Sequence, residues 1–264
     1  MMGVILMAVG CATLPPARLS SRDRQRQRIA TELEGQGDAD SLAAAGLLRE
    51  LYDRADSLAL LARAAMAAPE RADLVWLQAQ GCRQAISCDS EPIDRRLREL
   101  DPSNGAGWLG ELVRASSAEN DAAKDAALTA MSHAERVDIY WTTLVARLSR
   151  ATTRTGLISL EEAETLIIGV VAAHAIPAYA AASNACKGER LRRHETVDFC
   201  RGIARAFQRG DTYITEMMGV SIAQRVWAVD TPEWSAAAEA RRVFQYRTKP
   251  SMGCPQTGRV PRSI

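Results

Sequence analysis

Tryptophan recurs at a nearly constant interval in the first part of this chain. Trp76, Trp108 and Trp141 stand 32 and 33 residues apart, although the 264 residues include only five tryptophans. Each opens a stretch of helical apolar spacing, and Pro69 and Pro102 precede the first two by seven and six residues. Self-similarity at such an interval is typical of arrays of two-helix repeats, in which each unit buries its apolar face against its neighbours. The interval therefore predicts a stack of helical hairpins.

The sequence around the second tryptophan resembles the junction between tetratricopeptide (TPR) repeats. The Leu-Asp-Pro-x-Asn turn of that family is present at 100–104, Trp108 follows it, and Leu112 supplies an apolar residue one turn later. The Gly-x-x-Tyr that normally comes next in the family is absent. The resemblance covers 42–148 and implies a right-handed stack of helical hairpins, a TPR-like α-solenoid, which we place at residues 39–151.

Helical spacing continues through the rest of the chain, and no run of alternating β-branched residues is long enough for a strand. We therefore expect an all-α fold, in which a C-terminal helical bundle portion at 152–246 follows the stack. Residues 12–38 are expected to form a linker that becomes helical toward Ile29, and residues 247–264 a disordered tail. The expected helices are 40–52, 56–68, 72–85, 91–100, one from Trp108, 121–134, 138–150, 159–174, 179–186, 189–209, one bearing Ile214 and Val226, and 231–244.

The N-terminus resembles the signal of a bacterial lipoprotein. Residues 3–10 are apolar or small and lead into Gly10-Cys11-Ala12. In that family a small residue precedes the cysteine that is cleaved, lipidated and becomes the new N-terminus. The resemblance implies that residues 1–11 are the signal and lipidation site, with the lipid on Cys11, and that Ala12 directs the protein to the outer membrane, facing the periplasm. The apolar run is too short to cross a membrane, which takes about 20 residues, so we expect membrane contact only through this anchor.

Four of the other cysteines form two local pairs. Cys82 is close in sequence to Cys88, and Cys186 to Cys200, and each pair straddles an expected helix end where two Cα atoms can approach about 5.5 Å. Disulfides persist in the periplasm, so this pairing agrees with the expected compartment. Metal binding is the alternative, but neither pair has Cys-x-x-Cys spacing and the three histidines are scattered. Cys254 is left without a partner.

Common enzyme motifs do not occur in the sequence, which lacks His-Glu-x-x-His, Gly-x-Ser-x-Gly, a P-loop and Gly-x-Gly-x-x-Gly. Glu161, Glu162 and Glu164 could serve as the paired carboxylates of a peptidoglycan hydrolase. Ser159 with Glu162 three residues later also forms a capping box that starts a helix, and acidic residues in the first turn of a helix stabilise its dipole. We therefore favour this helix-starting role for the cluster over a catalytic one. The repeated tryptophans could line a ligand groove or fill the core. A net charge of +1 gives no reason to expect nucleic acid, and we expect no catalytic residue, metal or cofactor.

These observations favour a non-enzymatic, periplasm-facing lipoprotein whose TPR-like surface binds another envelope or periplasmic protein, since repeat arrays present extended surfaces. The alternative is an immunity or inhibitor protein that neutralises an antibacterial effector directed at the envelope. An acidic concave surface would favour that alternative. An envelope enzyme is a third possibility, which a buried group of carboxylates with open access would favour.

The lipoprotein resemblance makes a direct prediction about the mature chain. The mature protein should lack residues 1–10 and carry acyl chains on Cys11, because Gly10-Cys11 is the only suitable processing site. Intact-mass spectrometry of the membrane fraction measures both properties, with Cys11→Ser as the unlipidated control. Recovery of the wild-type chain from the soluble cytosol with Met1 in place would contradict the prediction.

Overall fold

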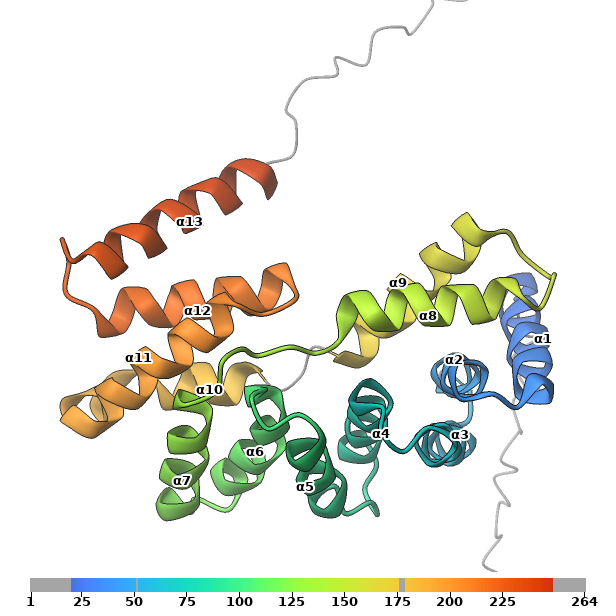
Figure 1. The fold of residues 1–264 in the computed structure, drawn as a ribbon, viewed down its shortest axis with the longest axis horizontal. Helices are drawn as coiled ribbons and strands as arrows, with labels where there is room; N and C mark the ends of the chain where they lie inside the picture. Colours follow the sequence, from blue (N-terminus) through green and yellow to red (C-terminus); the bar gives the residue numbers. More distant parts are fainter. Residues whose placement is uncertain (1–19, 51, 176–178, 249–264) are drawn as a thin grey trace, which may run out of the picture.

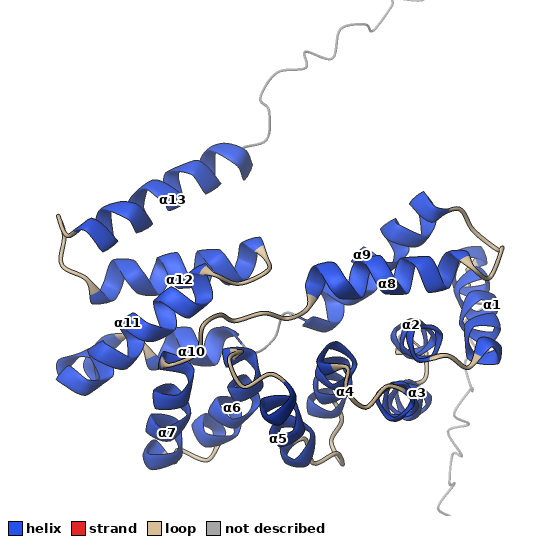
Figure 2. Ribbon diagram, in the orientation of Figure 1, coloured by secondary structure: helices blue, strands red, loops and turns tan. Residues whose placement is uncertain are grey.

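A computed structural model describes residues 20–50, 52–175 and 179–248, and all the regular structure in these residues is helical. The described part has no β-strand (Figure 2), so the all-α prediction is confirmed. A single isolated β-bridge in these residues joins Asn104 to Arg136. The α-helices are α1 (Ser21–Gln36), α2 (Ala39–Arg49), α3 (Arg54–Ala67), α4 (Ala72–Gln84), α5 (Glu91–Leu100), α6 (Leu109–Ser117), α7 (Asp121–Ser132), α8 (Trp141–Thr153), α9 (Leu160–Ala175), α10 (Tyr179–Ala185), α11 (His194–Gln208), α12 (Tyr213–Val226) and α13 (Pro232–Thr248). Short 3-10 helices at Gly105–Trp108 and Gly188–Arg192 precede α6 and α11.

Helices α2 to α7 form a row in which each helix packs against the next (Figure 1). Helix α2 is the most deeply buried, because α1, α3, α8 and α9 all pack on it. Every residue from Ser41 to Leu48 is buried, and most of them are small. Gly46 is needed for the closest of these contacts, since a Cβ atom there would lie 3.0 Å from the side chain of Leu61. The alanine-rich composition thus permits four neighbours around one helix.

After α7 the chain turns back over this row. Helices α8 and α9 pair with each other and pack on α2, and α9 also contacts α4, while α11 packs on α7 and α10 on α6 (Figure 1). The α8–α9 hairpin therefore covers the start of the row and does not extend it beyond α7. The structure differs here from the predicted boundary between 39–151 and 152–246, because that boundary would separate two helices that form one hairpin.

Helix α1 occupies most of the segment that we expected to be a linker. Ser20 caps it by accepting a hydrogen bond from the N–H of Asp23, and Ile29, Ala30 and Leu33 are buried on one face that packs on α2. The helix is ordered by this packing, because its own composition is strongly polar. The predicted tail begins two residues too early, because Arg247 and Thr248 belong to α13. Cys11, Cys254 and the rest of that tail lie outside the described residues.

The segment between α7 and α8 is extended and is held by side chains on one side. Asn104 binds the backbone of Asp138 twice: its Nδ2 donates to the carbonyl oxygen at 2.8 Å and its Oδ1 accepts from the N–H at 2.9 Å. Arg136 donates to both carboxylate oxygens of Asp101. The turn at 100–104 thus supplies partners for a backbone that has no strand or helix to satisfy it.

On the other side of the segment, Asp211 accepts hydrogen bonds from the N–H of Ile139 at 3.0 Å and of Trp141 at 2.6 Å. Tyr140, between them, has the left-handed φ of 60°. These contacts explain why α8 begins at Trp141 instead of at the predicted residue 138. The backbone before Trp141 is bound by side chains from other parts of the chain, and a left-handed residue cannot continue a right-handed helix.

The three tryptophans of the repeat occupy different positions. Trp76 lies in the second turn of α4 and is fully buried, so it is a core residue. Trp108 ends the 3-10 helix before α6 and is partly exposed, with the guanidinium of Arg98 4.5 Å from the centre of its ring. Trp141 is the first residue of α8 and is also partly exposed. The constant interval therefore does not correspond to one repeated packing site.

This difference predicts unequal effects of removing the rings. Trp76→Ala should lower the free energy of unfolding by about 3–5 kcal/mol, the range for deleting a buried large aromatic side chain. Trp108→Ala should cost clearly less, because part of its ring is already in contact with water. Urea unfolding followed by circular dichroism measures both values, and equal losses would contradict the assignment of Trp76 alone to the core.

Candidate functional site

A groove of about 770 Å³ lies between α1, α2 and α9, with the start of α3 at its edge. Its apolar lining includes buried residues of α1 and α2, residues of α9 and one residue just before α9, namely Ile29, Leu47, Leu166, Val170 and Ile158. Charged side chains of both signs surround this lining, namely Arg22, Arg26, Arg54, Glu50, Glu161 and Glu162. The groove thus combines an apolar base with a charged border, a combination suited to binding another molecule.

Two walls of the groove come from elements far apart in the sequence. One wall is α1, which lies within the segment expected to be a linker, so the sequence did not predict the groove. The spacing of Ile29, Ala30 and Leu33 is the signal that could have identified this wall. The other wall is α9, where Gly169 is exposed and no atom lies within 4 Å of the position of a Cβ. The groove is therefore open at Gly169.

Two of the three carboxylates that we considered for catalysis, Glu161 and Glu162, line this groove, and Glu164 does not. The carboxylate of Glu162 accepts hydrogen bonds from the N–H and Oγ of Ser159, both at 2.9 Å, which confirms the predicted capping box. These hydrogen bonds lower the pKa of Glu162. A general acid needs a raised pKa near the working pH, so the geometry of Glu162 favours a role in starting α9.

A buried histidine lies next to the groove and joins three helices. The Nδ1 of His174 lies 2.6 Å from the Oε2 of Glu50, and its Nε2 lies 3.1 Å from the carbonyl oxygen of Leu77. The side chain of His174 is fully buried, so both ring nitrogens are engaged with α2 and α4 and neither faces the groove. The hydrogen bond from His174 lowers the pKa of Glu50. This pair ties α9 to the row of helices and so fixes the wall of the groove.

Both predicted disulfides are present in the structure. Cys82 bonds to Cys88 with a Cα–Cα distance of 5.2 Å, and Cys186 bonds to Cys200 with a distance of 5.7 Å. The first closes the loop that follows α4, and the second links the end of α10 to α11. Neither lies in the groove, so their contribution is to stability.

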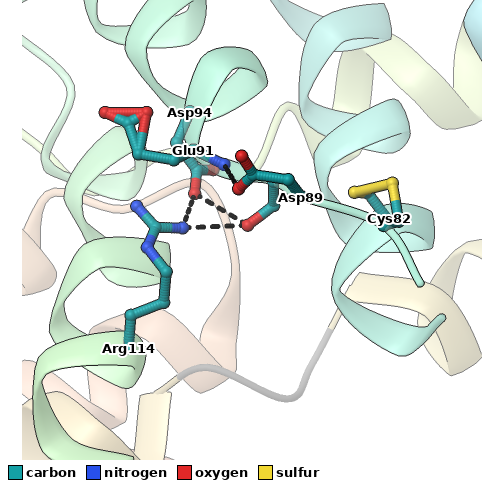
Figure 3. Close-up of a disulfide and its surroundings, with 7 residues drawn as sticks. Cys82, Asp89, Glu91, Asp94 and Arg114 are labelled. Carbon is teal, nitrogen blue, oxygen red and sulfur yellow. Dashed lines mark hydrogen bonds and ion pairs between the residues drawn. A yellow bond between two sulfur atoms is a disulfide. The ribbon is translucent and has the colours of Figure 1, made fainter. Parts of the chain in front are cut away.

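Beyond the first disulfide lies a buried ionic cluster (Figure 3). Asp94 of α5 is fully buried and pairs with Arg83 of α4. It also pairs with Arg114 of α6, whose Nη1 lies 2.7 Å from Asp94 and 2.9 Å from the Oγ of Ser90, as Figure 3 shows. A Cβ atom on Gly110 would collide with Asp94 and Arg83, so this position has no room for a side chain. One carboxylate therefore joins three consecutive helices, and a sequence pattern cannot reveal such a pairing.

Comparison of the chain with protein-family models, with curated proteins and with solved structures finds no match. In the described part of the chain, no three His, Cys, Asp or Glu side chains are grouped so that they could hold a metal ion. No single described helix is long and apolar enough to cross a membrane. Helices α9 and α10 are long and apolar enough only when taken together, as a pair bent by 42°.

The Glu50–His174 pair predicts a pH dependence. The pKa of Glu50 is lower in the folded protein than in the unfolded chain, where it is about 4.3. Its stabilising effect is therefore complete above that value and is lost as the pH falls through the folded pKa. Glu50→Gln should lower the free energy of unfolding at pH 7 by about 1–3 kcal/mol and flatten its dependence on pH below 5.

The matched control for this test is Glu161→Gln, which removes an exposed carboxylate from the same groove. The free energy of unfolding of each variant is measured by thermal or urea unfolding between about pH 3 and pH 7, a range that includes the pKa of a glutamate in the unfolded chain. The same loss of stability in both variants would show that the Glu50–His174 contact is not responsible.

Proposed function

We propose that this protein is a non-enzymatic, lipid-anchored binding protein of the bacterial envelope, and that its groove between α1, α2 and α9 holds a segment of another envelope or periplasmic protein. The observation that carries the proposal is the groove itself, with its apolar base and charged border. In this proposal the row from α2 to α7 is a right-handed TPR-like stack, and the α8–α9 hairpin closes back on its first helices.

The form of the groove favours an amphipathic protein segment as the occupant. Apolar side chains of a partner would cover Leu166 and Val170, while its charged residues would pair with arginines from α1 and carboxylates from α9. Burial of such side chains supplies about 25 cal/mol per Å² of apolar area, and the two signs of charge select the orientation of the partner.

The proposed location rests on two supports. The lipoprotein-like Gly10-Cys11 precedes α1 by a short segment, so the lipid would hold the groove near the membrane surface. The two disulfides support an oxidising compartment such as the periplasm. We therefore propose that the protein is anchored to the outer membrane by lipidated Cys11 and faces the periplasm.

The border of the groove bears on the alternative of an immunity or inhibitor protein. An inhibitor of a basic effector should have an acidic concave surface. The border of the groove instead contains three arginines and three carboxylates. The surface thus favours an amphipathic partner of mixed charge over a strongly basic effector.

The glycine in the groove offers a test of the proposed function. A photo-reactive side chain at Thr165 in the full-length protein should cross-link one envelope protein in living cells. Gly169→Trp should abolish that cross-link, because the indole would occupy the open groove while the helix tolerates it. Gly35→Trp is the matched control, since Gly35 is also exposed in a helix with no atom near its Cβ position and does not line the groove.

The expected result is loss of the cross-link in Gly169→Trp and its retention in Gly35→Trp. Cross-linking that is unchanged in both variants would reject the groove as the binding site. Hydrolysis of peptidoglycan or phospholipid by the purified protein, with loss of activity in Glu161→Gln or Glu162→Gln, would show instead that the protein is an enzyme.

A further inference from the structure

A second cavity, separate from the groove, is lined mainly by aromatic and apolar side chains. It has a volume of about 400 Å³ and lies where the segment before α8 meets the start of α12. Ile139 and Tyr179 are buried at its base, whereas Tyr213 and Ile214 are 43% and 46% exposed at its opening. Trp141 also lines it, so three aromatic residues line a space of the size that small ligands occupy.

One carboxyl group, that of Asp211, lies in the lining of this cavity. No cationic side chain of the described residues lies within ion-pair distance of Asp211. The neighbouring Asp138 adds a second carboxyl group close enough to share a hydrogen bond with Asp211. The guanidinium of Arg136 binds both oxygens of Asp101 and lies 3.7 Å from Asp138. A second guanidinium, that of Arg247 on α13, donates to the hydroxyl of Tyr213 at 2.8 Å.

The charges around the cavity therefore do not balance. The carboxyl groups of Asp101, Asp138 and Asp211 share the guanidinium of Arg136. The N-terminus of α8 lies at Asp211, where Trp141 donates its N–H at 2.6 Å, and adds about half a positive charge. Negative charge therefore remains beside the aromatic cavity. In the free protein a proton compensates for it, because burial and the carboxyl of Asp138 raise the pKa of Asp211 to about 7.

We propose that this cavity binds a small quaternary ammonium cation, held by the rings of Trp141, Tyr179 and Tyr213 and by the charge of Asp211. Aromatic rings attract such cations through their electron-rich faces, and the uncompensated carboxyl groups supply the complementary charge. A quaternary ammonium group needs no hydrogen-bond acceptor, which suits Asp211 because each of its oxygens already accepts a backbone N–H. The bound cation replaces the proton on the carboxyl pair.

Calorimetric titration of the full-length Cys11→Ser protein with choline tests the proposal, with 3,3-dimethylbutanol as the neutral molecule of the same shape. Choline should bind at millimolar concentration and the neutral analogue should not. Because the cation displaces a proton from a group with a pKa of about 7, affinity should rise about tenfold from pH 6 to pH 8. Proton release should accompany binding, which titrations in buffers of different ionisation enthalpy measure.

Two variants separate the contributions of charge and aromatic rings. Asp211→Asn should weaken binding by at least about tenfold and remove its pH dependence. Since that change also affects the backbone contacts before α8, its folding is checked by circular dichroism. Tyr213→Ala, at an exposed position, should weaken binding about fivefold without unfolding the protein. Tyr246→Ala is the control, because Tyr246 is 82% exposed on α13 and does not line the cavity.

Vesicles provide the final arm, because the same cation occurs free and in lipid headgroups. If phosphatidylcholine vesicles do not compete with choline for the protein, the ligand is a free cation. If phosphatidylcholine vesicles compete and phosphatidylglycerol vesicles do not, the ligand is a lipid headgroup. Equal affinity for choline and 3,3-dimethylbutanol, or no binding of choline, would overturn the proposal. None of these results depends on the groove between α1, α2 and α9.

Discussion

The backbone between α7 and α8 is the constraint on which the arrangement of the two layers depends. This segment connects the row of helices to the hairpin that turns back over it, and it forms no helix or strand of its own. Asn104 binds it from one side and Asp211 from the other, across 34 and 72 residues of sequence. If either contact were lost, buried peptide groups would be left without partners, at about 1–3 kcal/mol each. The position of α8, and with it of α9, follows from these two side chains.

Buried ionic and polar pairs hold the rest of the row together. Asp94 joins α4, α5 and α6 through two arginines, and His174 joins α9 to α2 and α4. Such groups are costly to bury and are strongly destabilising when one partner is removed. They therefore define which helices are neighbours more sharply than the alanine-rich apolar faces can, because small side chains pack acceptably in several registers.

The groove and the aromatic cavity both result from the return of the α8–α9 hairpin. Helix α9 forms one wall of the groove and contributes Ala172 to the cavity. Without that return, α1 and α2 would have no opposite wall, and Trp141 would have no contact with the start of α12. The two proposed binding sites thus depend on the way the layers close, and they differ in chemistry, since one has a border of mixed charge and the other an uncompensated carboxyl group.

The sequence by itself determined the helical class, most helix positions and the cysteine pairs. Helix α5 has the predicted bounds of 91–100, and Ser159 and Glu162 form the predicted capping box, because caps, turns and local disulfides depend on residues a few positions apart. Only the tertiary structure decided that α1 is a packed helix, that α8 starts at Trp141 and that the repeated tryptophans are not equivalent. Each of these depends on contacts between residues far apart in the sequence, such as Asp211 with Trp141, whose energies no local pattern records.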